Sequence, residues 1–204
     1  MHKPECKGFF QPACPITLAS ASPRRKELLQ ALGLAFAVCP YDGKEPPAES
    51  TESPEEYALR TARLKAMGVA GSYPGSVVIG ADTIVVLEGK IMGKPRDRED
   101  AIYTLTELSG RRHQVVTGCS FICHEKEFMQ EFTVSSWVWI ASFSQEIIRA
   151  YVDTGEPMDK AGSYAVQGMG SFMIEKIEGS YTNVVGLPLY ETIDLLLKNG
   201  FLKR

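Results

Sequence analysis

The stretch from Val77 to Pro95 constrains the fold most strongly, because it places one carboxylate, Asp82, inside a long aliphatic run. The run predicts a buried β-strand, and the pair Glu88-Gly89 after it is typical of a tight hairpin turn. The returning segment would bring Lys94 back towards Asp82. An ionised carboxylate in an apolar strand is costly unless a cation, a metal or a substrate meets it. Asp82 is therefore a candidate functional residue, and a structural role in a turn or an arginine pair is about equally consistent with this stretch alone.

Length and charge limit the class of protein and the class of partner. The chain has 204 residues, of which 44% are hydrophobic, enough for one sizeable core with two lobes. We expect a single domain over residues 16–204. The net charge of -3 provides no global field to hold a polyanion, and the basic residues occur in short clusters rather than in one stripe. Small anionic ligands therefore fit the pattern better than DNA or RNA.

Compartment is indicated by the cysteines and by the lack of long apolar runs. Five cysteines, an odd number without a dense framework, favour a reducing environment. The opening residues lack the apolar core of a signal peptide, and no run approaches the roughly 20 apolar residues of a membrane span. We expect a soluble, cytoplasmic protein without a membrane partner. Residues 1–15 are expected to form a disordered N-terminal extension.

A helix start soon after the first predicted strand has an unusual distribution of charge. Ser22 is a candidate N-cap and Pro23 a candidate first helical residue. Arg24 and Arg25 then fall in the first turn, where cations oppose the helix dipole and the unpaired backbone N–H groups. An anionic ligand would resolve this conflict. The free N–H groups, the hydroxyls of Ser20 and Ser22 and two guanidinium groups predict a phosphate-binding cradle, with two solvated arginines as the alternative.

The remaining pattern alternates helices and strands, which predicts an α/β fold with a mixed sheet flanked by helices. Polar and proline-rich residues 39–54 predict a surface loop that carries Glu45. Ser53 and Glu56 predict a capping box that opens a helix containing Lys65. The other expected elements are a helix capped by Asp97, an antiparallel ribbon over 113–123 and 127–141, a helix from Ser144, a glycine-rich loop over 159–170 and a last helix from Pro188.

Four segments in order carry a family resemblance: LASASPRRKELL from Leu18, GADTIVVLEGKIMGKP from Gly80, DKAGSYAVQG from Asp159 and GSYTNVVGLPL from Gly179. Together they resemble the Maf family of nucleoside triphosphate pyrophosphatases, also called septum-formation-inhibitor proteins. The resemblance covers nearly everything from Ile16 to Leu197. It implies an elongated α/β fold with two lobes around a cleft, similar to inosine triphosphate pyrophosphatases, and a homodimer.

The resemblance also implies an activity and a set of site residues. The family hydrolyses a nucleoside triphosphate to a monophosphate and pyrophosphate, with Mg²⁺ or Mn²⁺ as the expected cofactor. Asp82 matches the catalytic carboxylate that accepts a proton and contributes to metal binding. Positions for phosphate or metal binding are matched by Ser20, Arg25, Glu45, Lys65 and Lys94. The segment Asp42-Gly43-Lys44-Glu45 is less acidic than the family's usual run, which weakens the metal assignment of Glu45.

Three further positions resemble one branch of the family. Arg24, Thr83 and Gln167 fall where members acting on dTTP and UTP carry Arg, Thr and Gln, whereas the branch acting on 7-methylguanosine triphosphate carries Trp, Gln and Glu. All three are therefore expected to contact substrate. Two alternatives remain open at this point: a non-catalytic nucleotide-binding regulator of cell division, and a phosphatase that releases orthophosphate.

Overall fold

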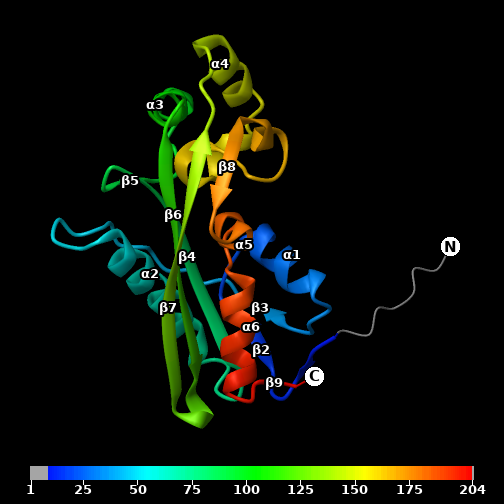
Figure 1. The fold of residues 1–204 in the computed structure, drawn as a ribbon. Coiled ribbons are helices and arrows are strands. Elements are labelled where there is room, and N and C mark those ends of the chain that lie inside the picture. Colours follow the sequence, from blue (N-terminus) through cyan, green and yellow to red (C-terminus); the bar gives the residue numbers. More distant parts are fainter. Residues whose placement is uncertain (1–8, 204) are drawn as a thin grey trace.

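A computed structural model describes residues 9–203 of the chain. A seven-stranded mixed sheet runs along the length of the molecule (Figure 1). The strands follow the order β3 (Ala37–Val38), β2 (Ile16–Leu18), β4 (Val77–Leu87), β6 (Arg112–Cys123), β7 (Phe128–Ile140) and β8 (Ile174–Glu178), and β5 (Lys90–Met92) pairs with β4. The β2 strand runs parallel to β3 and β4, while β6, β7 and β8 continue the sheet in antiparallel pairs. This confirms the expected mixed sheet and the long β6–β7 ribbon.

Helices cover this sheet and begin where the sequence signals place them. They are α1 (Pro23–Ala31), α2 (Pro54–Ala70), α3 (Arg98–Leu108), α4 (Gln145–Asp153), α5 (Tyr181–Val185) and α6 (Leu189–Lys198), with short 3-10 turns η1 (His124–Lys126), η2 (Glu156–Asp159), η3 (Ala161–Ser163) and η4 (Met169–Met173). Ser53 and Glu56 form both bonds of the expected capping box, and Asp97 caps α3. Ser22 precedes α1 as expected, but within the described residues its side chain makes no capping bond.

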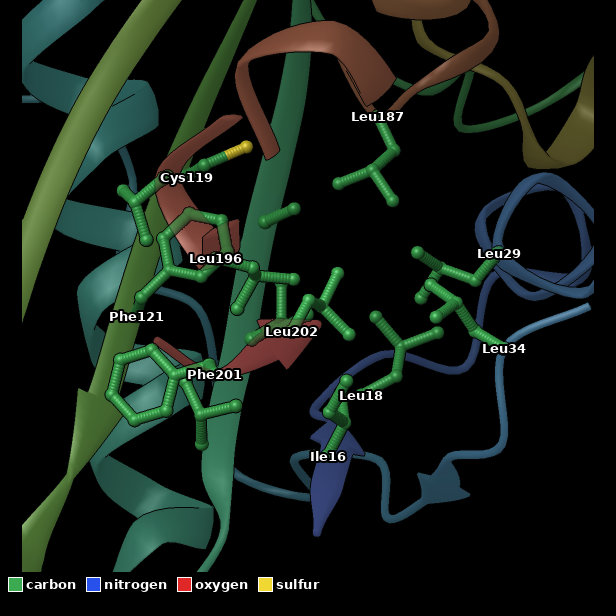
Figure 2. Close-up of a cluster of buried hydrophobic side chains, with 14 of the residues drawn as sticks. Ile16, Leu18, Leu29, Leu34, Cys119, Phe121, Leu187, Leu196, Phe201 and Leu202 are labelled. Carbon is green, nitrogen blue, oxygen red and sulfur yellow. The ribbon is translucent and has the colours of Figure 1, made fainter. Parts of the chain in front are cut away.

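Hydrophobic side chains form four clusters among the described residues, and the two largest lie at opposite ends of the sheet, in two lobes. In the first lobe, side chains from β2, α1, β6 and α6 point towards one another, among them Leu18, Leu29, Phe121 and Leu196 (Figure 2). The second core lies at the other end of the sheet, where α3 and α4 pack against the ends of β4, β6 and β7 around residues such as Leu105 and Ile148 (Figure 1). Strands β4, β6 and β7 run through both lobes and hold them together.

Helix α2 lies unusually close to the sheet at two glycines. A Cβ added to Gly80 of β4 would lie 2.2 Å from the carbonyl oxygen of Ala62 and 2.7 Å from the backbone nitrogen of Ala66. At Gly118 of β6 an added Cβ would lie 2.5 Å from the carbonyl carbon of Ala58. Only glycine permits this approach of backbone to backbone. The two glycines therefore set the height of α2 above the sheet.

The N-terminal segment differs from expectation where the structure describes it. Residues 1–8 lie outside the described residues, so the expected disorder of the extension is tested only over residues 9–15. There β1 (Gln11–Pro12) pairs with β9 (Leu202–Lys203), and Phe10 packs against the first core. The expectation of disorder does not hold for these residues, because their apolar side chains find a place beside the C-terminal strand. Within residues 9–203, no helix is both long and apolar enough to cross a membrane.

Candidate active site

The candidate site lies at a gap along one edge of β4. This edge pairs with β2 over Val77–Ile79 and with β5 over Val85–Leu87. Residues 80–84 between these two partners leave the edge open. Successive side chains of a strand point to opposite faces, so at an open edge Asp82 and Thr83 can reach the same space from the two faces of the sheet. The gap explains why adjacent residues both line one cleft.

The cleft has a volume of about 310 Å³ and two chemically distinct groups of lining residues. The polar group comes from the loop after β2, the start of α1, the loop between β3 and α2, the middle of α2 and the centre of β4: Ser20, Ser22, Arg24, Arg25, Glu45, Lys65, Asp82 and Thr83. The apolar group comes from β4, β6, α5 and the segment 161–166: Val85, Val115, Ala161, Tyr164, Ala165, Val166, Val184 and Val185. Lys94, Asp159 and Lys160 add charged side chains, and the lining is completed by Ala19, Ala21, Pro23, Tyr41 and Gly186. Such a cleft suits a ligand with a highly charged part and a flat, less polar part.

Asp82 forms an ion pair with Lys65 in the cleft. The Nζ atom of Lys65 on α2 donates to Oδ1 of Asp82 at 2.7 Å and lies 3.0 Å from Oε1 of Glu45. Asp82 and Lys65 are nearly buried, with 13% and 11% of their side chains exposed, whereas the Glu45 side chain is 46% exposed. One ammonium group thus joins a carboxylate of the central strand to a carboxylate of the surface loop. The structure brings together three of the residues singled out from the sequence.

Tyr41 explains how the Glu45 loop is held against α2. Its ring packs on the helix at Gly68, where an added Cβ would lie 2.5 Å from the ring, and its hydroxyl lies over Gly43. Tyr41 also lines the cleft. Tyr41 is not among the residues singled out from the sequence. A glycine inside a predicted helix, unfavourable by about 1 kcal/mol relative to alanine, is the one signal that could have pointed to a close neighbour at this position.

Arg25 is buried, and protein atoms already accept most of its hydrogen bonds. Its donors reach the carbonyl of Gly186 from Nε at 2.7 Å, Ser20 Oγ and the Ala81 carbonyl from Nη1 at 3.0 and 2.8 Å, and Thr83 Oγ1 from Nη2 at 2.9 Å. Burial lowers the pKa of Arg25 from its ordinary value, and the charge of Asp82 acts in the opposite direction. These contacts use four of the five N–H donors of the guanidinium group. Arg25 therefore ties α1 to β4 and to the end of α5, with one donor left for a ligand.

These hydrogen bonds predict that Arg25 contributes to the stability of the fold, which a residue that only contacts phosphate would not do. Arg25→Met should lower the free energy of unfolding by about 3 kcal/mol, because it leaves the Ala81 carbonyl unpaired in the interior and leaves the Gly186 carbonyl only its longer contact with the Thr83 hydroxyl at 3.3 Å. Denaturant unfolding would measure the loss, with Lys26→Met as an exposed control on the same helix. An Arg25→Met protein as stable as the parent would show that these bonds contribute little and that Arg25 is mainly a ligand contact.

Thr83 belongs to the same buried network. Besides the bond from Arg25, its hydroxyl lies 2.9 Å from Thr117 Oγ1 on β6, and Thr117 reaches the carbonyl of Asn183 at 3.3 Å. Asn183 in turn donates from Nδ2 to Ser136 Oγ and to the Val115 carbonyl, each at 3.0 Å. Neither Thr117 nor Asn183 was given a role from the sequence. Their importance arises from long-range contacts, which no local pattern announces.

The other residues singled out from the sequence differ in their position relative to the cleft. Arg24 faces Asp159, with 3.7 Å between Nη1 and Oδ2, and Lys94 is exposed among the lining residues. Gln167 is exposed and falls outside the described residues that line the cleft, although its neighbour Val166 lines it. Ser20 is buried, and its Oγ accepts from the backbone nitrogen of Ser22 at 3.2 Å as well as from Arg25.

His113 has a structural environment at the start of β6. It is fully buried behind Tyr164, with 2.8 Å between Nε2 and the tyrosine hydroxyl. Burial lowers the pKa of His113 to about 4, so the ring is neutral at neutral pH. Its role is to support Tyr164, which belongs to the apolar wall of the cleft.

The donor set of the cleft fits a divalent cation that arrives with a phosphorylated ligand. Among residues 9–203, no group of three or more His, Cys, Asp and Glu side chains is arranged to hold a metal ion. Glu45 and Asp82 nevertheless contact one ammonium group, so their oxygens lie close together. Mg²⁺ is commonly bound by one or two carboxylates together with substrate phosphates and waters. Two carboxylates at the cleft match that requirement.

The fold and cleft define an α/β protein with a charged cleft that fits a small phosphorylated ligand beside a nearly buried carboxylate. The chain belongs to the Maf-like protein family, whose model matches residues 15–199. It is 50% identical over 192 residues to a dTTP/UTP pyrophosphatase of Geotalea uraniireducens, covering 94% of this chain and 98% of the relative. It is 49% identical over 183 residues to a dTTP/UTP pyrophosphatase of Desulfotalea psychrophila, covering 90% and 93%.

One solved structure aligns over most of the chain but differs in detail. It is a nucleoside-triphosphatase, also titled dITP/XTP pyrophosphatase, from Mycobacterium abscessus, with 18% sequence identity and a TM-score of 0.40. The alignment covers 91% of this chain and 95% of that chain. A score of this size is too low to support a detailed superposition, so the architecture described above rests on the chain's own contacts.

Proposed function

We propose that the protein hydrolyses nucleoside triphosphates, with dTTP and UTP as preferred substrates, to a nucleoside monophosphate and pyrophosphate. The observation that carries this proposal is the Asp82 carboxylate, nearly buried at the open edge of β4 and paired with Lys65 inside the cleft. Two relatives that match this chain over more than nine-tenths of their own length are named dTTP/UTP pyrophosphatases, and these names support the substrate class.

The proposed reaction assigns one role to each group of lining residues. A water molecule attacks the α-phosphorus, the bond between the α-phosphorus and the bridging oxygen breaks, and pyrophosphate leaves with that oxygen. Asp82 orients the water and accepts its proton. Lys65, Lys94 and the first turn of α1 neutralise the phosphate oxygens, because attack on a highly charged phosphorus needs charge compensation first. The apolar wall receives the nucleoside.

A divalent cation, Mg²⁺ or Mn²⁺, would be held by Glu45 and Asp82 and would supply further charge neutralisation when bound. Lys65 contacts both carboxylates in the structure and balances part of their charge. We also propose a cytoplasmic homodimer without a nucleic-acid or membrane partner. The net charge of -3 supports the absence of nucleic acid, and sedimentation of the purified protein would test the dimer.

The substrate and the bond that is cleaved can be tested together with a nucleotide panel. With Mg²⁺ or Mn²⁺, the protein should convert dTTP and UTP to monophosphate and pyrophosphate. It should act poorly on 7-methylguanosine triphosphate, because a mismatched polar edge leaves buried groups unpaired. Gln167, exposed beside Val166, is proposed to meet the base edge with an amide that can both donate and accept. Pyrophosphate and orthophosphate should be measured separately.

Each alternative has its own outcome in this assay. Orthophosphate as the first product would indicate a phosphatase. Nucleotide binding, seen as a rise in Tm, without turnover under any metal condition would indicate a binding regulator. Equal rates on purine and pyrimidine triphosphates would contradict the branch assignment and leave the pyrophosphatase reaction standing.

A further inference from the structure

A carboxylate behind the cleft holds the loop that forms part of its apolar wall. Glu156, at the start of η2, accepts three hydrogen bonds: from the Tyr151 hydroxyl at 2.8 Å, from the backbone nitrogen of Met169 at 2.9 Å and from that of Gly170 at 2.8 Å. Burial alone would raise the pKa of Glu156, but these hydrogen bonds outweigh it and hold the pKa below its ordinary value. Glu156 is therefore an anion bound by its own chain.

The backbone around Glu156 is shaped to receive this side chain. Gly168 has a φ of +90°, and a Cβ added there would lie 2.3 Å from Oε1 of Glu156. A Cβ added to Gly170 would lie 2.4 Å from the hydroxyl of Tyr151. Both glycines thus make room for the two polar side chains. Consecutive backbone N–H groups in such a turn form a binding site for an anion, and here the anion is a side chain of the protein.

Tyr151 extends this arrangement into the wall of the cleft. Its hydroxyl donates to Glu156 and also accepts from the backbone nitrogen of Ala165 at 3.2 Å. Ala165 and its neighbours Tyr164 and Val166 line the cleft, while Tyr151 and Glu156 lie behind them, outside the described residues that form the lining. The loop over residues 164–170 is thus held at its start by Tyr151 and at its end by Glu156.

We propose that Tyr151 and Glu156 are positioning residues for nucleoside recognition: they fix the 164–170 loop, so that the wall formed by Tyr164, Ala165 and Val166, together with Gln167 at the rim, is ready to receive the base and sugar. The inference rests on the proposed function. It assigns recognition of the nucleoside to a loop that is separate from the Asp82–Lys65 pair. A change in this loop should alter binding of the nucleoside and leave binding of the phosphates intact.

Conservative variants test this separation. Glu156→Gln keeps the shape of the side chain, but it replaces one oxygen that accepts from a backbone N–H with an NH2 group, which can only donate. Tyr151→Phe keeps the aromatic ring and removes the hydroxyl. Each should raise the KM for dTTP about tenfold, the scale of losing one or two hydrogen bonds, with kcat within about threefold of the parent. Inhibition by inorganic pyrophosphate, which has no nucleoside, should keep its parental Ki. The double variant should raise the KM by less than the product of the two single effects, because the two residues share one bond while each also holds backbone groups of its own.

Matched controls and the contrary outcomes complete the experiment. Glu175→Gln and Tyr190→Phe make the same chemical changes at exposed positions and should behave as the parent does. Parental KM values for both folded variants would overturn the inference. A parallel loss of dTTP and pyrophosphate binding would also overturn it, because it would show that the two residues only support the fold. A parent protein that hydrolyses no triphosphate would instead overturn the proposed function.

Discussion

Replacing Asp82 with asparagine is expected to lower kcat by about 10²-fold or more, the scale of losing a general base. The asparagine side chain has nearly the same shape, so the fold should persist. It cannot accept a proton from water, and it removes the charge that pairs with Lys65 at 2.7 Å. Lys65 keeps its contact with Glu45, which should hold the ammonium group in the cleft. Nucleotide binding, measured as a rise in Tm, should therefore remain.

A control for this experiment is available elsewhere in the chain. Glu131 on β7 is also paired with a cation, Arg63, and its side chain is 13% exposed, the same fraction as for Asp82. Glu131→Gln thus removes a carboxylate of similar exposure outside the cleft and should leave kcat unchanged. Asp82→Asn protein that folds and turns over dTTP at the parental rate would contradict the role of Asp82 as the base.

Local signals explain how much of the fold could be predicted. The Ser53–Glu56 capping box, the Asp97 cap and the Glu88-Gly89 turn each involve residues only a few positions apart, and all three form as expected. The β6–β7 ribbon follows from alternating side chains and a short connection. The pairing of β1 with β9 joins opposite ends of the chain, and such contacts leave no periodic pattern in either segment.

The same distinction between local signals and long-range contacts applies to the residues of the site. Asp82 could be found because a carboxylate in an aliphatic strand is unusual in itself. The burial of Arg25 could not be anticipated, since it depends on carbonyls contributed by β4 and by Gly186, 161 residues further along the chain. Glu156 could not be singled out from the sequence, because two of its three donors, the backbone nitrogens of Met169 and Gly170, come close to it only after the 164–170 loop folds back.

Gly80→Ala is expected to lower stability strongly, because it separates α2 from the sheet. The added Cβ would lie 2.2 Å from the Ala62 carbonyl oxygen, and backbone atoms on both sides leave no flexible side chain to move away. Overpacking of this kind costs about 3 kcal/mol of unfolding free energy. Lys65 lies between the two contact points on α2, so a displaced helix should also lengthen the Lys65–Asp82 bond and lower kcat.

Another glycine of α2 provides a control with the opposite sign. Gly71, at the C-cap, has a φ of -61° that alanine adopts freely, and an added Cβ there would meet no described atom within 4 Å. Gly71→Ala should raise the free energy of unfolding by about 0.5 kcal/mol, since alanine restricts the unfolded chain more than glycine does. Denaturant unfolding and dTTP turnover of both variants test the argument. Equal stability of the two variants would show that α2 can move away from β4 at little cost, and Gly80 would then have no role in placing Lys65 against Asp82.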